Sequence, residues 1–168
     1  MMCVAELKTL PDGVQRVAAA LLAADHPHAP VMLDDAARTA QQAADALGVL
    51  VGQIAKSIIF RRKDDDAAVL VITSGDRRVD EKKVAALVGK ISRADADFVR
   101  ARTGFAIGGV SPVAHATPAV TLIDRELFRF DEIWAAAGHP HGVFKLRPDD
   151  LVRLTGAPVA DIDQPAAS

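Results

Sequence analysis

Lys56 is the residue of this sequence whose surroundings are least typical of its type. It lies in the segment 54–60, IAKSIIF, where Ile54, Ile58 and Phe60 stand at even spacing from it. Residues two apart share one face of a strand, so this lysine would lie among apolar side chains. Such a lysine either extends to an edge of the fold or points a cation into a pocket. In a pocket, its ammonium group would suit a phosphate or a developing oxyanion.

A glycine-rich segment, 104–112 with the sequence GFAIGGVSP, is the second candidate. The paired Gly108 and Gly109 permit a positive φ or a close approach of the backbone, and Pro112 stiffens the exit. Such a loop can present backbone N–H and C=O groups to a ligand. The alternative is a tight connection between a helix and a strand. His115 follows the loop and has either a local role or a packing role.

Two His-Pro-His sequences, His26 with His28 and His139 with His141, resemble pairs of metal ligands. No cysteine or carboxylate set completes a known ligand spacing around them. We therefore expect surface loops and no metal.

Several other chemistries lack their sequence signatures. Neither Ser74 nor Ser111 lies in G-x-S-x-G, and no GxGxxG or Walker A sequence is present. The single cysteine, Cys3, excludes an internal disulfide and a multi-cysteine zinc site, and its place near the N-terminus makes it a poor nucleophile candidate. Serine hydrolysis, dinucleotide binding and P-loop chemistry are therefore not expected.

Strand pairs mixed with irregularly spaced helices must position these residues, which predicts an α+β fold. In the first part, Thr39 with Gln42 has the spacing of a capping box, and Asp80 and Asp95 are expected N-caps. The elements predicted there are a helix over 13–24, a helix from 39 to 48, a hairpin of strands 54–62 and 67–73 joined across 64–66, and helices over 80–88 and 95–103.

The second part begins with a loop over 103–118. We predict a strand over 119–124, a helix from Asp131 to Gly138, a strand over 142–146, a helix from Pro148 to about Gly156, an edge strand over 159–162 and a frayed tail over 163–168.

Length and composition suit one folded domain over residues 1–168. The chain has 17.7 kDa, half of its residues are hydrophobic, and its net charge is −2. Charge is uneven, because 56–102 holds 12 Lys and Arg against 8 Asp and Glu. That excess could face a phosphate-bearing ligand, although solvated faces explain it nearly as well. No apolar run is long enough for a membrane span and no signal peptide is visible, so a cytoplasmic protein without membrane contact is expected.

Taken together, these segments resemble the YbaK / prolyl-tRNA-synthetase-associated domain family of free-standing aminoacyl-tRNA deacylases. The match covers residues 39–154. It rests on the ordered segments TAQQAA from 39, AKSIIF from 55, Asp80 with Lys82 and Lys83, TGFAIGGVSP from 103, and TLID from 121.

The resemblance implies a YbaK-like mixed α/β fold, with a curved mixed sheet or partial barrel surrounded by helices. It implies hydrolysis, in trans, of the ester that joins a wrong amino acid to the 3′ end of a tRNA, often tRNA(Pro), with prolyl-tRNA synthetase as a candidate partner. No cofactor and no metal are implied. By the same resemblance Lys56, Gly108 and Gly109 are the catalytic residues, and the substrate-binding residues are Thr39, Ile58, Ser74, Val110, Ser111, Pro112 and His115.

One departure limits this transfer. Alanine-editing relatives can carry a histidine where this chain has Gly109, so alanyl specificity is not carried over. Esters of small amino acids remain the expected substrates. An aminoacyl ester is already activated, and its hydrolysis mostly needs positioning and oxyanion stabilisation. The alternatives are a non-catalytic module of the same fold that binds a tRNA end, a nucleotide or a synthetase, and a metal-dependent hydrolase that uses the His-Pro-His pairs.

Overall fold

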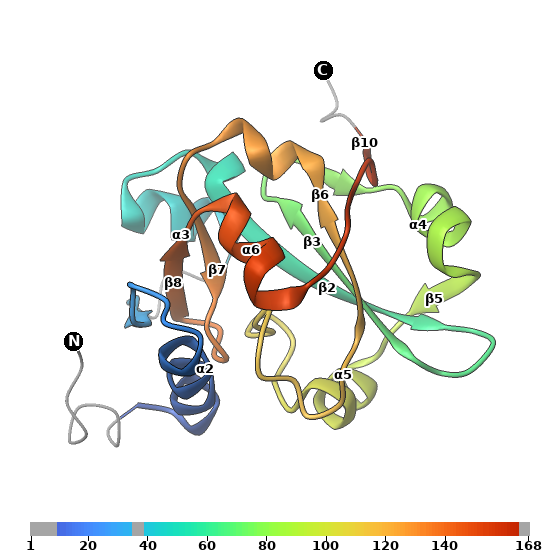
Figure 1. The fold of residues 1–168 in the computed structure, drawn as a ribbon, viewed down its shortest axis with the longest axis horizontal. Helices are drawn as coiled ribbons and strands as arrows, with labels where there is room; N and C mark the ends of the chain where they lie inside the picture. The colour runs from blue at the N-terminus through green and yellow to red at the C-terminus, as the bar shows by residue number, and fades with distance from the viewer. Residues whose placement is uncertain (1–9, 35–38, 165–168) are drawn as a thin grey trace.

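The structure is a computed structural model that describes residues 10–34 and 39–164 (Figure 1). Cys3 lies outside these residues. In chain order the elements are α2 (Asp12–Ala23), β1 (Val31–Met32), α3 (Ala40–Leu47), η1 (Val51–Gln53), β2 (Ile54–Arg62), β3 (Ala68–Ser74), β4 (Arg78–Val79), α4 (Glu81–Val88), β5 (Ile91–Arg93), α5 (Ala96–Thr103), β6 (Val120–Asp124), η2 (Arg125–Arg129), β7 (Ile133–Ala136), β8 (Gly142–Leu146), α6 (Pro148–Thr155), β9 (Val159–Ala160) and β10 (Asp163–Gln164).

The predicted hairpin forms the centre of the molecule. Strands β2 and β3 pair antiparallel from Ala55 opposite Ser74 to Arg61 opposite Ala68. Every residue of β3 is buried, and its second neighbour, β6, runs parallel to it. A strand covered on both faces reads as a continuous apolar run, as the AVLVIT sequence of β3 does.

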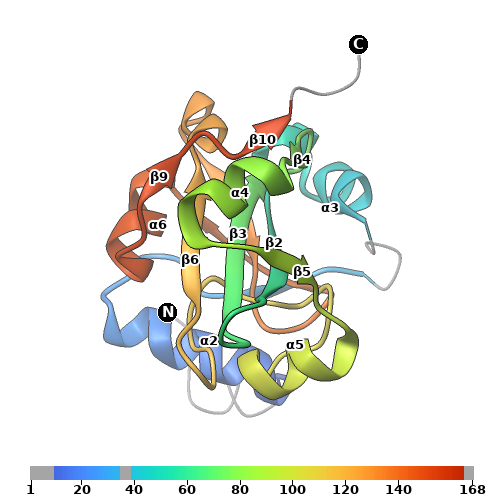
Figure 2. The same ribbon diagram turned by 90° about the vertical axis from the view of Figure 1, so that its right-hand side faces the viewer.

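The main sheet is mixed, with the order β1-β8-β7-β2-β3-β6-β9 and with β5 also paired to β2. One face packs against α2, α5 and α6, which contribute Val17, Leu21, Val99 and Leu151 to a common core. The opposite face packs against Val84 of α4, as Figure 2 shows with α4 in front of β3. The expected α+β fold with a mixed sheet surrounded by helices is therefore confirmed.

The predicted N-caps are also present. Thr39 and Gln42 form the capping box of α3, and Gly48 ends that helix with φ at +70°. The Asp80 carboxylate accepts hydrogen bonds from the N–H groups of Lys82 and Lys83, and Asp95 accepts one from Phe98. These local signals fix where the helices beside the sheet begin.

The helix predicted from Asp131 to Gly138 is wrong, because Ile133–Ala136 forms β7. Its residues alternate between buried and half-buried, which fits a strand. Pairing decides the outcome, since β7 lies between β2 and β8 and bonds to both. A short apolar run such as IWAA is ambiguous until its neighbours are known.

The frayed tail does not begin at residue 163. Asp163 and Gln164 pair with Val79 and Arg78, and Asp163 is 5% exposed. Two-residue strands of this kind carry no periodic signal, so only the tertiary pairing shows them. Residues 165–168 lie outside the described part. The expected edge strand over 159–162 is shorter, because only Val159–Ala160 pairs with β6. Among the described residues, no helix has the length and apolar character to cross a membrane.

Candidate active site

A gap in the hydrogen-bonded ladder of β2 places Lys56 at an opening of the sheet. On the side of β2 away from β3, β7 pairs only with residues 54–55 and β5 only with residues 60–62. No described strand pairs with residues 56–59 on that side. Backbone polar groups there remain available to a ligand.

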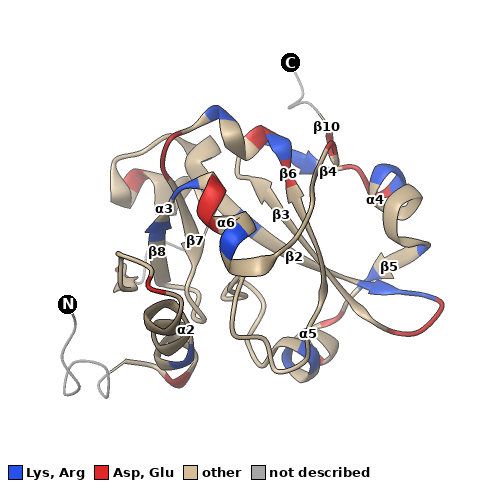
Figure 3. Ribbon diagram, in the orientation of Figure 1, with Lys and Arg blue, Asp and Glu red and all other residues tan. Residues whose placement is uncertain are grey.

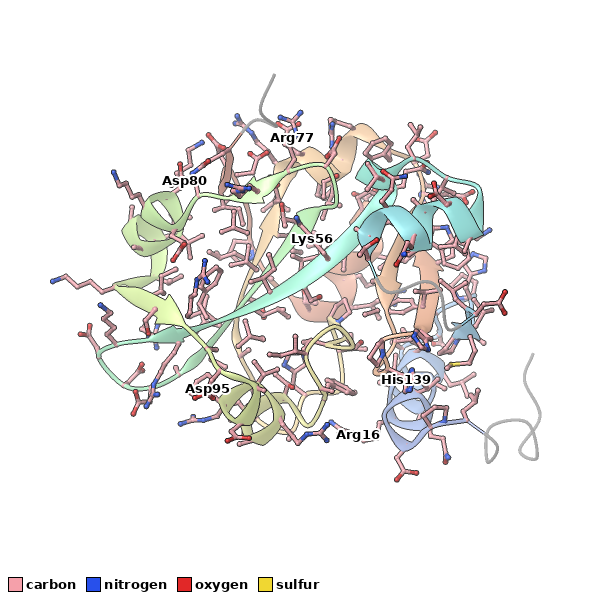
Figure 4. All side chains as sticks on the ribbon, turned by 180° about the vertical axis from the view of Figure 1, so that it is seen from behind. Arg16, Lys56, Arg77, Asp80, Asp95 and His139 are labelled. Carbon is pink, nitrogen blue, oxygen red and sulfur yellow. The ribbon has the colours of Figure 1, made fainter. Side chains whose placement is uncertain are left out.

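This gap opens into a cavity of about 1030 Å³, which we call the Lys56 cavity. Its walls come from the middle of β2, the β4–α4 junction, β5, α5 and the loop 107–110. The lining residues are Lys56, Ser57, Ile58, Ile59, Phe60, Arg78, Val79, Asp80, Glu81, Lys82, Arg93, Ala94, Val99, Ile107, Gly108, Val110 and Gln164. In Figure 4, which views the molecule from behind, Lys56 lies on β2 with Asp80 and Arg77 above it.

Lys56 is half-buried and has no carboxylate within ion-pair distance among the described residues. Burial lowers the pKa of its ammonium group, and the Arg78 guanidinium lowers that pKa further, while Asp76 opposes both. A desolvated cation without a partner attracts an anion strongly, because the local dielectric is low. The position therefore suits a phosphate or an oxyanion.

The cavity has two chemically different sides, because it wraps around the open edge of β2. The face of β2 that carries Lys56, Ile58 and Phe60 turns toward α4. The other face carries Ser57 and Ile59 and meets apolar residues of α5 and the glycine loop. One side is thus cationic and the other is almost entirely apolar.

The glycine loop borders the cavity through two of its predicted residues. Gly108 is exposed with φ at +88°, and Val110 is buried beside it. Gly109 does not line the cavity. A Cβ there would lie 2.8 Å from backbone atoms of His139, so this glycine permits a close contact between two loops.

The rest of the loop supports its shape. The His115 ring donates from Nε2 to the Ser111 carbonyl at 2.6 Å and packs edge-on against Phe105. Burial lowers the pKa of His115. The Ser111 hydroxyl accepts a hydrogen bond from the N–H of Val113, and Pro112 is buried next to it. None of Ser111, Pro112 and His115 lines the cavity.

Two other predicted residues lie elsewhere. Thr39 caps α3, and Ser74 donates a hydrogen bond to the Gly52 carbonyl while accepting one from Arg129 at 2.9 Å. Neither lines the Lys56 cavity. Of the ten predicted site residues, the structure brings four together around the cavity: Lys56, Ile58, Gly108 and Val110.

Sequence reasoning missed Ser57, Arg78 and Arg93 as cavity residues. The Ser57 hydroxyl is buried and has no hydrogen-bond partner. Arg78 and Arg93 reach the cavity only because the short strands β4 and β5 are folded against its rim. The basic excess over residues 56–102 was the available signal for the arginines.

The histidines of the two His-Pro-His sequences contact one another and the backbone of the described residues. The rings of His139 and His141 lie 5.3 Å apart, and His26 donates to the Lys145 carbonyl at 2.8 Å. The described residues contain no group of three His, Cys, Asp or Glu side chains that could hold a metal ion.

Comparison with known proteins agrees with this geometry. A family model described as "Aminoacyl-tRNA editing domain" matches residues 34–154. YwhH of Bacillus subtilis (strain 168), an uncharacterized protein, is 34% identical over 114 residues, which cover 67% of this chain and 72% of YwhH. The "Putative Cys-tRNA(Pro)/Cys-tRNA(Cys) deacylase EbsC" of Enterococcus faecalis (strain ATCC 700802 / V583) is 28% identical over 126 residues, 74% of this chain and 76% of that protein.

A solved structure is also similar along nearly the whole chain. It is described as a "putative trans-editing enzyme for prolyl tRNA synthetase", is 41% identical, and superimposes with a TM-score of 0.87. The match covers 92% of this chain and 99% of that one. The matched family and the shared fold confirm the resemblance inferred from the sequence motifs: the chain belongs to the family of aminoacyl-tRNA editing domains.

Proposed function

We propose that this aminoacyl-tRNA deacylase binds the charged 3′ end of its tRNA in the Lys56 cavity and hydrolyses the ester there. The reaction class, hydrolysis of aminoacyl-tRNA, follows from the family match and from the activities named for its relatives. The place of reaction is supported by one observation above the others. Lys56 is a half-buried cation without a carboxylate partner at the only stretch of β2 that lacks a second neighbouring strand within the described fold.

The chemistry needs little more than this arrangement. A water oxygen attacks the ester carbonyl carbon, the bond to the ribose oxygen breaks, and the ribose hydroxyl leaves with a proton. Lys56 stabilises the negative charge on the carbonyl oxygen or on the terminal phosphate. The free backbone groups of residues 56–59 and of the loop at Gly108 orient the ester and the water.

The size and walls of the cavity support a nucleotide-linked substrate with a small amino acid. A volume of about 1030 Å³ exceeds what an amino acid alone needs, and it suits a terminal adenosine with its aminoacyl group. Ile59, Val99 and Val110 form branched apolar walls, and Ser57 adds one hydroxyl near them. We infer that alanine-sized and serine-sized esters enter and that aromatic ones do not.

We further propose that the substrate is mischarged tRNA(Pro) and that the reaction takes place in the cytoplasm. The protein would remove wrong amino acids that prolyl-tRNA synthetase has attached. Support comes from the trans-editing description of the similar structure and from the tRNA(Pro) substrate in the name of EbsC. Prolyl-tRNA itself should be spared.

A deacylation screen tests the proposal. Purified protein is incubated with tRNA(Pro) charged with alanine, serine, threonine, cysteine, proline or phenylalanine, and the loss of ester is followed over time. We expect hydrolysis of one or more small esters and no acceleration for prolyl-tRNA and phenylalanyl-tRNA. Binding of every charged tRNA without turnover would instead favour the non-catalytic module.

A further inference from the structure

We propose that Arg78, Lys82 and Arg93, here called the cationic rim, bind the phosphodiester groups of the single-stranded tRNA end next to the terminal adenosine. This inference rests on the proposed function, because it assumes that the ester reaches Lys56. It adds a second recognition element, through which the protein distinguishes an ester carried on RNA from the same ester on a nucleoside.

The argument begins with the ion pairs of the molecule. Eight Lys and Arg side chains of the described residues have a carboxylate within ion-pair distance, among them Arg62 with Asp65 at 2.8 Å, Lys83 with Asp161 at 3.0 Å and Arg129 with Asp76 at 2.9 Å. The three rim side chains have no such partner among the described residues, although all three line the same cavity and are exposed. Figure 3 shows these cationic segments at β4, α4 and β5.

Two neighbouring lysines in the first turn of α4, Lys82 and Lys83, differ in whether they have a carboxylate partner. Lys83 binds Asp161 and the Asp163 carbonyl on the far side of the helix start, whereas Lys82 lines the cavity unpaired. The charge of Lys83 is therefore neutralised by a contact within the fold. Lys82 has no carboxylate partner among the described residues and lies at the cavity.

Two carboxylates also line the cavity, and neither forms an ion pair with a side chain of the cationic rim. Asp80 accepts hydrogen bonds from the backbone N–H groups of Lys82 and Lys83 as the N-cap of α4. Glu81 is exposed on the first turn of that helix, where the helix dipole favours it. With Lys56, the lining side chains carry four positive and two negative charges, so the cavity attracts anions.

The geometry of an RNA end fits this distribution. If the terminal adenosine and its ester lie beside Lys56, the chain leads back out of the cavity across its mouth, where the phosphates lie. Arginine matches phosphate because its planar fork donates two parallel hydrogen bonds, and lysine adds a point charge. A free nucleotide offers the same phosphate chemistry, and the experiment below separates the two sources.

The test compares one ester on two carriers. The small amino acid that the protein hydrolyses fastest on tRNA(Pro) is also attached to adenosine without phosphates, and kcat/KM is measured for both. For the double variant Lys82→Ala/Arg93→Ala we expect a loss of about 10- to 100-fold on tRNA and less than a twofold change on the adenosine ester. The slope of log kcat/KM against log salt should become shallower by about 0.7 for each lost phosphate contact.

A matched control uses Lys90→Ala/Arg100→Ala, which removes two exposed cations of the same basic segment that do not line the cavity. This variant should keep at least half of the activity on tRNA. AMP serves as the competing free nucleotide, and it should inhibit much more weakly than the trinucleotide CCA.

The outcomes separate the two proposals. Equal losses on both carriers, or an equal loss in the control variant, would overturn the cationic rim while leaving the deacylase intact. Inhibition by AMP as strong as by CCA would also overturn it. If the wild-type protein hydrolyses no ester, the proposed function fails, and binding of labelled CCA by the wild-type and double-variant proteins then tests the rim by itself.

Discussion

At the hairpin end of β2, Arg61 binds Asp66 at 2.7 Å and Arg62 binds Asp65 at 2.8 Å. Nearer the start of the same strand, Lys56 is half-buried and no described carboxylate binds it. The paired arginines lie at the end of β2 and bind carboxylates of the exposed turn that follows, where ion pairs contribute little to stability. An unpaired cation that is partly desolvated costs free energy in the folded state. The difference fits our proposal that Lys56 binds an external anion, while the ion pairs at the hairpin end belong to the fold.

Of the substitutions considered, removal of the Lys56 side chain should lower deacylation activity most. We expect Lys56→Ala to lower kcat about 10²- to 10³-fold, because a positioned charge is lost from the transition state. The melting temperature should stay the same or rise, since partial burial disfavours the ionised form of this lysine and lowers its pKa. Deacylation kinetics and thermal melting measure both. Arg61→Ala is the control and should keep its activity within twofold; full turnover by Lys56→Ala would contradict the assignment.

Gly108 and Gly109 should differ in the same way, one affecting mainly activity and the other mainly stability. Gly109→Val should destabilise the protein by about 1–3 kcal/mol, because its side chain would meet the His139 backbone. Gly108→Ala has room, since the nearest atoms belong to Pro140 at 4.0 Å, and it should cost only about 1 kcal/mol for its positive φ. Denaturant unfolding checks this order. At equal folded concentration, activity should depend on residue 108 more than on residue 109, and the reverse result would place Gly109 at the ester.

The loop under the cavity should respond to acid through His115. Its pKa lies below the ordinary value of 6.5 because of burial, and its Nδ1 is buried without a partner. Between the lowered pKa and 6.5 the unfolded chain binds more protons than the folded one, so stability should rise with pH across that window and level off above it. Melting temperatures of the wild type and of His115→Gln between pH 5 and 8 test this. A wild-type profile no steeper than that of the variant would contradict it.

The smallest effect is expected at the hairpin tip. The hydrogen bond from Arg62 is the main cause that lowers the pKa of Asp65 to about 2, although this carboxylate is exposed. Asp65→Asn should leave deacylation unchanged and shift the melting temperature by no more than about 3 °C at neutral pH. A clear loss of activity would show that the two ends of β2 are not independent.

Local signals account for what could be predicted from the sequence. Short segments predict the β2–β3 hairpin and the helix caps at Thr39, Asp80 and Asp95. Family motifs predict that Lys56 and the loop at Gly108 lie at the same cavity. The strand β7 was missed because IWAA carries no decisive period, and its state depends on β2 and β8.

The remaining parts of the site depend on tertiary structure. Arg78 and Arg93 belong to two- and three-residue strands whose positions are set by β10 and by β2. Whether a cation has a partner also depends on segments distant in sequence, as Lys83 and Asp161 show. Ser74 and Thr39 looked like ligand contacts, but the hydrogen bonds that they make belong to the scaffold.

The most direct test of the central claim is to map where an unreactive substrate binds. Adenosine whose 3′ oxygen is replaced by an amide linked to alanine or serine keeps the shape of the ester and resists hydrolysis. Titrated into isotope-labelled protein, it should shift the backbone amide signals of residues 56–59, 78–82 and 107–110, with little change in Lys56→Ala. Shifts centred instead on a separate groove of the surface, which Leu87, Thr121 and Val159 line, would contradict the account.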